Sequence, residues 1–260
     1  MLKIKLEPFL GMVLINLAGG IIAVPVLIYT GLPQTQSWPW LLTSTAVHIA
    51  YYFALAEAYR RADMGQVYPI ARGSAPLLTA VISIVFFGEV VSPLGMVGIA
   101  MLGAGIFVMS MKSAKDAAHM DRTALMFAGI TAVSICAYTL SDGNGARVSG
   151  NALAYIAALH VADGFVFTLF AWWMRGTAGL KPIVNFAGIG LAGGAMSAGA
   201  YGIAIWAMTV APIPLVAAVR ETSVLFGAAI AVIILKEPLR ANRIAAAVMI
   251  LTGLMMIRLQ

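Results

Sequence analysis

Nine apolar segments of membrane-spanning length dominate the sequence. They cover residues 8–30, 40–59, 65–87, 93–111, 122–140, 152–174, 184–208, 214–235 and 241–258. A helix needs about 20 mostly apolar residues to cross the hydrocarbon core of a bilayer. Only 10% of the residues are charged, whereas a soluble domain carries about 25%. The pattern predicts an all-α integral membrane protein with about nine transmembrane helices and short loops, embedded in a lipid bilayer.

Basic residues lie almost entirely on one side of this predicted topology. The loops on the other side carry only Arg147 and Arg258. Loops rich in Lys and Arg stay in the cytoplasm. We therefore expect an inner-membrane protein with a cytoplasmic N-terminus, a cytoplasmic Lys115, an external Arg147 and an external C-terminus. Because the net charge of +6 follows this rule, it does not indicate a nucleic-acid partner. The rich side holds Lys3, Lys5, Arg60, Arg61, Lys112, Lys115, Arg122, Arg175, Lys181, Lys236, Arg240 and Arg243.

An internal repeat relates the two halves of the chain. Residues 48–111 align without a gap to residues 196–259 at an offset of 148. The offset matches two kinds of residue that are rare here, placing Arg72 on Arg220 and Glu89 on Glu237. It spans five helices, and an odd number means that corresponding helices cross the membrane in opposite directions. We therefore predict two inverted-topology repeats, which are common in secondary transporters. The first covers 1–113 with four helices, and the second covers 120–260 with five.

The repeated segments resemble a known family. The first copy reads AYRRADMGQVYPIARGSAPLLTAVISIVFFGEVVSPLGMVGIAMLGAGIFVM, and the second reads VAAVRETSVLFGAAIAVIILKEPLRANRIAAAVMILTGLMMI. Both are similar to EamA-type members of the drug/metabolite transporter (DMT) superfamily. The resemblance implies ten helices in two inverted five-helix halves that carry a metabolite out of or into the cell. The chain departs from this pattern in its first half, where the first helix of the family is missing.

Asp163 is an ionisable residue near the middle of the sixth span, and His160 precedes it by three residues. Residues three apart share one face of a helix. Ionisable groups inside a bilayer are costly and often functional. The pair is interpreted either as a proton-coupling or substrate-binding site in a central cavity, or as a hydrogen-bonded contact that orients two helices.

Arg72 and Arg220 lie inside the third and eighth spans at equivalent repeat positions. One interpretation is that a guanidinium recognises an anionic group of the substrate. The alternatives are that the side chain extends to the membrane interface or pairs with Glu57 or Glu221.

Pro76 is expected to kink the third span and to leave the carbonyl of Arg72 without its helical hydrogen bond. Val224 occupies the equivalent position in the second repeat. The kink is therefore predicted for the first half alone.

Further polar residues in the first two spans are Asn16, His48, Tyr51 and Tyr52. Each is either pore-facing or part of a hydrogen bond between helices. Glu89 and Glu237 end their spans and are expected to stabilise the start of the next helix.

Ser92 and Pro93 have the residue types of a helix cap and a first helical position. The glycine-rich stretches 95–105 and 188–202, which include Gly190 and Gly194, are expected to be surfaces on which helices pack closely.

These features together predict a secondary transporter of a small metabolite that works by alternating access, with protons as an optional coupling ion. The alternative is a non-transporting membrane component, either an assembly partner or a binder of lipid head groups. The sequence contains no Walker motif, zinc cluster or nucleophilic triad. We therefore expect neither an enzyme nor a bound metal or cofactor. A homodimer is compatible with this reading.

Overall fold

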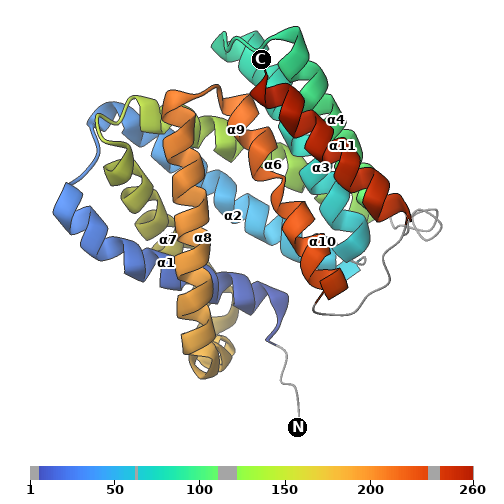
Figure 1. Ribbon diagram of the computed structural model, residues 1–260. Coiled ribbons are helices and arrows are strands. Elements are labelled where there is room, and N and C mark those ends of the chain that lie inside the picture. The colour runs from blue at the N-terminus through green and yellow to red at the C-terminus, as the bar shows by residue number, and fades with distance from the viewer. Residues whose placement is uncertain (1–5, 62–63, 111–121, 234–240, 260) are drawn as a thin grey trace. The chain divides into compact units, whose positions relative to one another are not determined.

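The computed structural model describes residues 6–61, 64–110, 122–233 and 241–259. These residues form α-helices joined by short turns and 3-10 segments, with no strand in these four ranges (Figure 1). The prediction of an all-α membrane protein is confirmed. The helices are α1 (Pro8–Thr30), α2 (Trp38–Arg61), α3 (Met64–Phe87), α4 (Pro93–Ser110), α6 (Arg122–Arg147), α7 (Ala152–Leu180), α8 (Ala187–Val210), α9 (Ile213–Arg220), α10 (Ser223–Ile233) and α11 (Ala241–Arg258).

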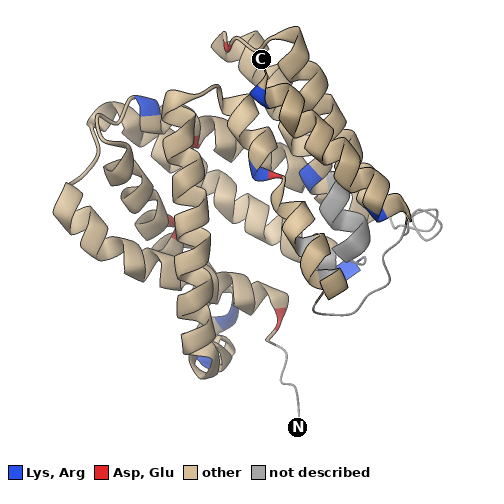
Figure 2. Ribbon diagram, viewed as in Figure 1, with Lys and Arg blue, Asp and Glu red and all other residues tan. Residues whose placement is uncertain are grey.

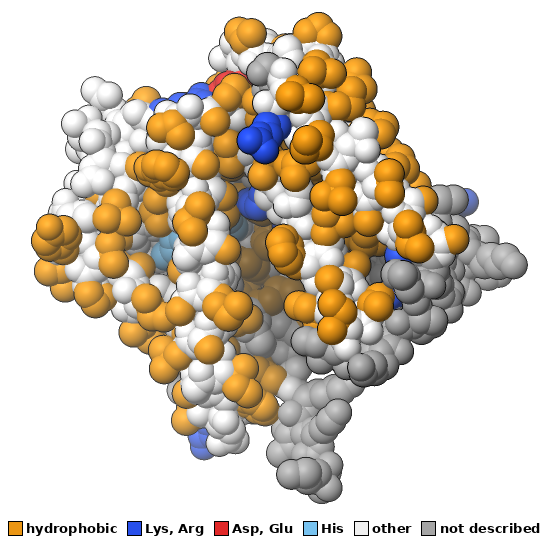
Figure 3. Space-filling view, in the orientation of Figure 1, with side chains coloured by type: hydrophobic (Ala, Val, Ile, Leu, Met, Phe, Trp, Pro, Cys, Tyr) orange, Lys and Arg blue, Asp and Glu red, His pale blue; other side chains and the backbone are white. Residues whose placement is uncertain are grey.

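The helical surface suits a lipid environment. Five helical stretches of the described chain are long and apolar enough to cross a membrane. Charged residues are sparse along the ribbon (Figure 2), and hydrophobic side chains spread over the face drawn in Figure 3. Large apolar residues such as Ile28, Trp173 and Phe226 are more than two-thirds exposed. A water-soluble protein rarely exposes so many, so this is a multi-pass membrane protein.

The helices differ from the predicted spans in three places. The α6 helix continues seven residues beyond position 140, and most of these added residues are buried. The helix α7 breaks at Gly176, which has φ 64° and ψ 177°, close to the predicted span end at 174, and a further helical segment follows to Leu180. Predicted span 214–235 is divided into α9 and α10 by a turn at Glu221 and Thr222. Apolarity alone therefore locates a helix but does not fix its ends.

The kink that the sequence predicts at Pro76 does not interrupt α3. That helix runs without a break from Met64 to Phe87, whereas the second repeat is interrupted after Arg220. The two halves therefore differ at this point, since the second is interrupted and the first is not. Proline removes one helical hydrogen bond, but a long helix tolerates this inside a membrane when neighbouring groups compensate.

The chain divides into two compact units, each described by itself. The first unit comprises Met1–Ala56 and Ser141–Val210. In it α1 packs against α7 and α8. The phenyl ring centroids of Phe9 and Phe167 lie 5.6 Å apart. Farther along α1, a Cβ placed on Gly20 would come within 2.9 Å of the His160 carbonyl oxygen. Contacts therefore move backwards along α7 as they advance along α1, so these helices are antiparallel.

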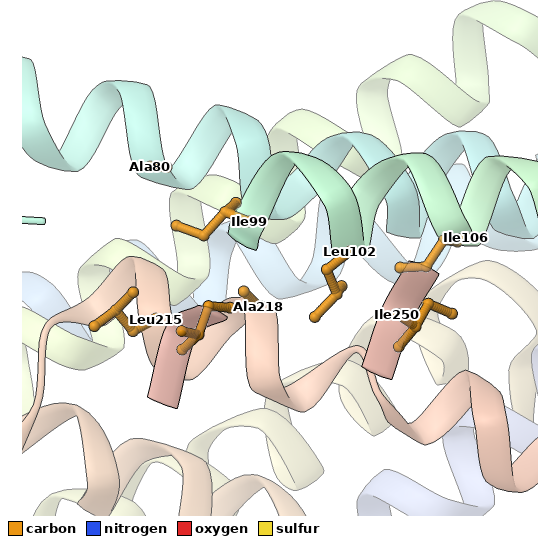
Figure 4. Packing of buried hydrophobic residues seen from close by; sticks show 8 residues of the cluster. Ala80, Ile99, Leu102, Ile106, Leu215, Ala218 and Ile250 are labelled. Atoms are coloured by element: carbon orange, nitrogen blue, oxygen red, sulfur yellow. The ribbon is translucent and has the colours of Figure 1, made fainter. Parts of the chain in front are cut away.

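The second unit comprises Glu57–Leu140 and Ala211–Gln260 and is built around α4 and α11. Its core includes Ile99, Leu102 and Ile106 of α4 with Ile250 of α11 (Figure 4). Two glycines permit the close approach. A Cβ on Gly98 would lie 2.7 Å from the carbonyl oxygen of Gly253, and one on Gly253 would lie 2.6 Å from that of Gly98.

Repeat-equivalent helices pair inside each unit. The bounds of α4 and α11 differ by the same 148 residues at both ends. Gly98 contacts Gly253, and Gly105 contacts Ala246. The repeat offset of 148 maps Gly98 onto Ala246 and Gly105 onto Gly253, so the two contacts are equivalent. Both pairings place an early residue of one helix beside a late residue of the other, as antiparallel packing requires. Each unit consequently draws helices from both predicted repeats, and the antiparallel pairing agrees with inversion.

Small residues line these interfaces, as the glycine-rich stretches predict. A Cβ on Gly190 would fall 2.4 Å from the Leu14 side chain, and one on Gly194 would fall 2.7 Å from the Cβ of Ala18. Small residues let helix backbones approach closely in membranes. The stretches 95–105 and 188–202 therefore pack α4 against α11 and α8 against α1.

Candidate functional site

Asp163 contacts His48 in the buried interior of the first unit. The Nδ1 atom of His48 on α2 lies 3.1 Å from Oδ2 of Asp163 on α7. It also lies 3.2 Å from the hydroxyl of Ser44, one turn earlier on α2. Asp163 is 8% exposed and His48 is 4% exposed. The second carboxyl oxygen, Oδ1, has no hydrogen-bond partner among the described residues. The side chain of Thr45 also lies beside the Asp163 carboxyl.

A second buried carboxyl, Asp142 of α6, was not singled out from the sequence. It is fully buried. The Tyr155 hydroxyl donates a 3.1 Å hydrogen bond to its Oδ1, and the Tyr201 hydroxyl donates a bond to its Oδ2. Gly145, one turn along α6, makes room for the Tyr155 ring, because any Cβ there would collide with it. Asp142 is close enough to Asp163 for the two carboxylates to interact electrostatically.

Aromatic rings surround this pair of carboxyls. The His48 ring stacks on Tyr52 with centroids 5.8 Å apart, and it meets the edge of Tyr201 at 6.0 Å. Tyr51 packs against both Tyr52 and His48. The Tyr52 hydroxyl donates a 2.6 Å hydrogen bond to Oδ1 of Asn16 on α1. Of the sequence candidates, His48, Tyr51, Asn16 and Asp163 thus belong to one unit, in which Tyr52 links Asn16 to the His48 ring.

His160 does not form the predicted pair with Asp163. Its Nδ1 atom lies 2.8 Å from the carbonyl oxygen of Ile156, one turn earlier on the same helix. Its ring meets that of Tyr201 at 6.3 Å. The two residues lie one turn apart on the same helix face, but the Nδ1 atom of His160 bonds to the Ile156 carbonyl and not to Asp163. Packing of α2 supplies His48 as the partner of Asp163 instead.

The equivalent arginines meet one carboxylate in the second unit. Arg72 Nη1 lies 3.0 Å from Oε1 of Glu221, and Arg220 Nε lies 3.6 Å from the same oxygen. Arg220 also donates a 3.3 Å hydrogen bond to the Tyr138 hydroxyl. Glu221 is fully buried. Of the alternatives for Arg72, pairing with Glu221 is the one observed, whereas Glu57 pairs with Arg60 and Arg61.

The sequence candidates Ser92 and Glu89 lie near helix ends. The hydroxyl of Ser92 accepts a 3.0 Å hydrogen bond from the amide of Gly95, and α4 begins at Pro93, so the predicted cap is present. Glu89 lies in the connection between α3 and α4, where its amide donates to the Ser83 carbonyl. Glu237 falls outside the described residues.

Outside the spans, Glu7 and Arg175 tie the start of α1 to α7. Arg175 donates hydrogen bonds of 2.5 and 2.8 Å to the two carboxyl oxygens of Glu7. This bond lowers the pKa of Glu7. The guanidinium also lies over the Phe9 ring, 4.7 Å from its centroid.

Of the two buried carboxyls, Asp163 could be predicted from the sequence as a candidate, whereas Asp142 was not. Asp142 follows the apolar part of the fifth span, in the run SDGNGAR, which resembles a loop. Tyr155 and Tyr201 are ordinary interfacial residues by type. A signal was nonetheless present, because an aspartate in a run that continues an apolar helix is costly unless it is bonded. Within the part of the chain that is described, no group of three or more His, Cys, Asp and Glu residues fits a metal ion.

Comparison with known proteins finds a family match for the first part of the chain. The sequence profile of the EamA-like transporter family matches residues 1–111. A solved structure described as "Crystal structure of protein" has a TM-score of 0.72 at 18% identity, covering 98% of this chain and 88% of that one. At this identity the likeness shows the fold alone. No curated protein sequence matches the chain significantly. The first four helices thus resemble the EamA-like transporter family, and nearly the whole chain shares the fold of that solved structure.

Proposed function

We propose that the chain is a secondary transporter of a small metabolite, working by alternating access and coupled to protons through Asp163 and Asp142. The observation that carries the proposal is the buried carboxyl pair in the first unit. Asp163 lies 3.1 Å from His48 and keeps one carboxyl oxygen without a hydrogen-bond partner among the described residues. Ionisable groups inside a membrane are costly and characteristically mark ion or substrate pathways.

The chemistry of the pair suits proton exchange. Two nearby carboxylates repel each other, so the state with both charged is unfavourable in a buried site. The His48 ring can hold a positive charge beside Asp163. A proton taken up by this group of residues is therefore exchangeable whenever the site opens to water. The antiparallel pairing of repeat-equivalent helices supports the alternating-access part of the proposal, since inverted repeats commonly rock against each other.

We further propose an inner-membrane location with the N-terminus in the cytoplasm. The support is the distribution of Lys and Arg over the predicted loops, which follows the positive-inside rule.

Reconstituted proteoliposomes test the transport proposal. A pH gradient would be imposed across liposomes containing a pH-sensitive dye, and a panel of amines, amino acids and carboxylates would be added. We expect at least one compound to dissipate the gradient only when the wild-type chain is present. The Asp163→Asn variant should lose gradient-driven transport of that compound but retain exchange at equal pH.

Glu57→Gln is the matched control, because Glu57 is a carboxyl paired with Arg60 and Arg61 outside the first unit. It should leave coupling unchanged. Wild-type pH dependence in Asp163→Asn would contradict the coupling role. Failure of the folded wild-type chain to move any compound would instead favour a non-transporting membrane component.

A further inference from the structure

A pocket of about 530 Å³ lies among α1, α7 and α8 of the first unit. Pockets of about 300–1,000 Å³ accommodate drug-sized ligands. The walls are almost entirely apolar and include Ile22 of α1, Ile156 of α7 and Trp206 of α8. His160 is the ionisable residue that lines it. In Figure 3 histidine side chains, in pale blue, are visible between hydrophobic ones. The pocket therefore suits a molecule with an apolar body.

The hydrogen bonding of His160 defines the polar end of such a molecule. A backbone carbonyl only accepts hydrogen bonds, so the Nδ1 atom 2.8 Å from the Ile156 oxygen carries the proton. In the neutral ring the other nitrogen, Nε2, is then an acceptor. A ligand that bonds to this neutral ring must present a hydrogen-bond donor.

Charge near the pocket favours a cationic donor. The His160 ring contacts Tyr201, and the Tyr201 hydroxyl bonds to the buried carboxyl of Asp142. Asp163 lies one turn from His160 on α7. The two arginines of this unit make contacts elsewhere, Arg147 with the Met208 carbonyl and Arg175 with Glu7. The ionisable groups behind the pocket therefore include two carboxyls, Asp142 and Asp163, and a carboxylate there attracts positive charge.

We propose that this pocket binds an amphiphilic amine, with its apolar body between α1 and α8 and its ammonium group directed to His160. The inference rests on the proposed transport function, because it names the class of molecule carried. A lipid acyl chain is the competing occupant, since it matches the apolar walls but has no use for the histidine or for the carboxyls behind it.

Calorimetric titration of the purified full chain in nanodiscs tests this, with empty nanodiscs subtracted. The probes are 4-phenylbutylamine, 4-phenylbutan-1-ol and 4-phenylbutyrate, which share one apolar body. We expect the amine to bind at least ten-fold more tightly than the alcohol, and the carboxylate to bind most weakly. Equal affinity for amine and alcohol, or no binding of the amine, would overturn the proposal.

Two glycines of α8 provide matched variants. Gly199 lines the pocket, and a Cβ there meets nothing within 4 Å, so Gly199→Leu fills the space without a backbone clash. Gly188 is equally open but is not one of the lining residues. Gly199→Leu should weaken amine binding at least ten-fold, whereas Gly188→Leu should leave it unchanged. An equal effect of both substitutions would overturn the location.

Mass spectrometry of the purified chain distinguishes the lipid alternative. Phospholipid that co-purifies, is lost in Gly199→Leu and is not displaced by the amine would assign the pocket to lipid and overturn the proposal. Because binding is measured without a gradient, amine binding by a chain that transports nothing would contradict only the transport function. Transport of another compound without amine binding would contradict only the ligand class.

Discussion

Asp163 on α7 meets His48 on α2 across 3.1 Å, although His160 stands one turn away from Asp163 on its own helix. The contact therefore joins two helices, whereas the bond of His160 to the Ile156 carbonyl stays within one. This difference separates the two histidines experimentally. A substitution at 48 removes the partner of a buried carboxyl, but a substitution at 160 does not.

The first prediction is that His48→Ala and Asp163→Asn are energetically coupled. Leaving a buried polar group without its partner costs about 1–3 kcal/mol. The double variant should therefore be more stable than the sum of the single losses implies, by about 0.5–3 kcal/mol. The measurement is the free energy of unfolding in mixed micelles. His160→Ala is the control, and it should combine additively with Asp163→Asn. A coupling energy at 160 as large as that at 48 would refute the assigned pairing.

Glu221 is predicted to be a structural residue of the second unit. It is fully buried and faces both Arg72 and Arg220. Breaking a buried ion pair by removing one partner costs about 3–5 kcal/mol. Glu221→Ala should lower the unfolding free energy in that range. Glu57→Ala is the control, because its partners Arg60 and Arg61 lie near the surface, where such pairs contribute about 0–1 kcal/mol. If both substitutions cost the same, Glu221 is not the anchor of the two arginines.

Gly98→Ala is predicted to separate α4 from α11. Its new Cβ would lie 2.7 Å from a backbone oxygen of Gly253, which cannot move aside as a flexible side chain can. Overpacking of this kind costs about 1–3 kcal/mol. In α6 a Cβ on Gly129 meets nothing within 4 Å. Gly129→Ala should therefore be neutral or gain up to about 1 kcal/mol through helix propensity. Thermal unfolding of the two variants compares them directly, and an unaffected Gly98→Ala would argue against the close α4–α11 contact.

The topology prediction concerns opposite ends of α7. Single cysteines would be placed at exposed positions 148 and 181 in a Cys136→Ala background. If the N-terminus is cytoplasmic, position 148 lies outside and position 181 lies inside. An impermeant thiol reagent should then label Val148→Cys in intact cells, but Lys181→Cys only after lysis. The reverse labelling pattern would invert the whole assignment, including the external C-terminus.

The existence and order of the helices could be predicted from the sequence, because lipid requires long apolar stretches with satisfied backbones. Their ends were less accessible. Residues 141–147 are polar yet continue α6. The interruption after Arg220 has no proline at its centre, whereas α3 stays helical through Pro76. Breaks and extensions depend on the neighbours that bond each polar group, and a single sequence does not contain those neighbours.

The sequence identified several residues of the candidate site, but it did not predict which of them contact one another. Asp163, His48 and Asn16 stand out because polar side chains are rare in these spans. Their partners depend on how α1, α2 and α7 approach one another. A Cβ on Gly20 would collide with the backbone of α7, so the depth of that approach is fixed by a small residue. Asp142 escaped notice because its surroundings in the sequence look like a loop.

The contact between Asn16 and Gly164 bears on how such a chain can arise. If the offset of 148 is extended from the aligned residues to α1 and α7, these residues become each other's counterparts, and a Cβ on Gly164 would lie 2.7 Å from the Asn16 carbonyl oxygen. In a dimer of identical half-length proteins the same residue would occupy both places. Asparagine at both would collide, and glycine at both would lose the bond to Tyr52. Covalent fusion of two ancestral copies removes this conflict, because one copy can keep the small residue while the other evolves polar chemistry.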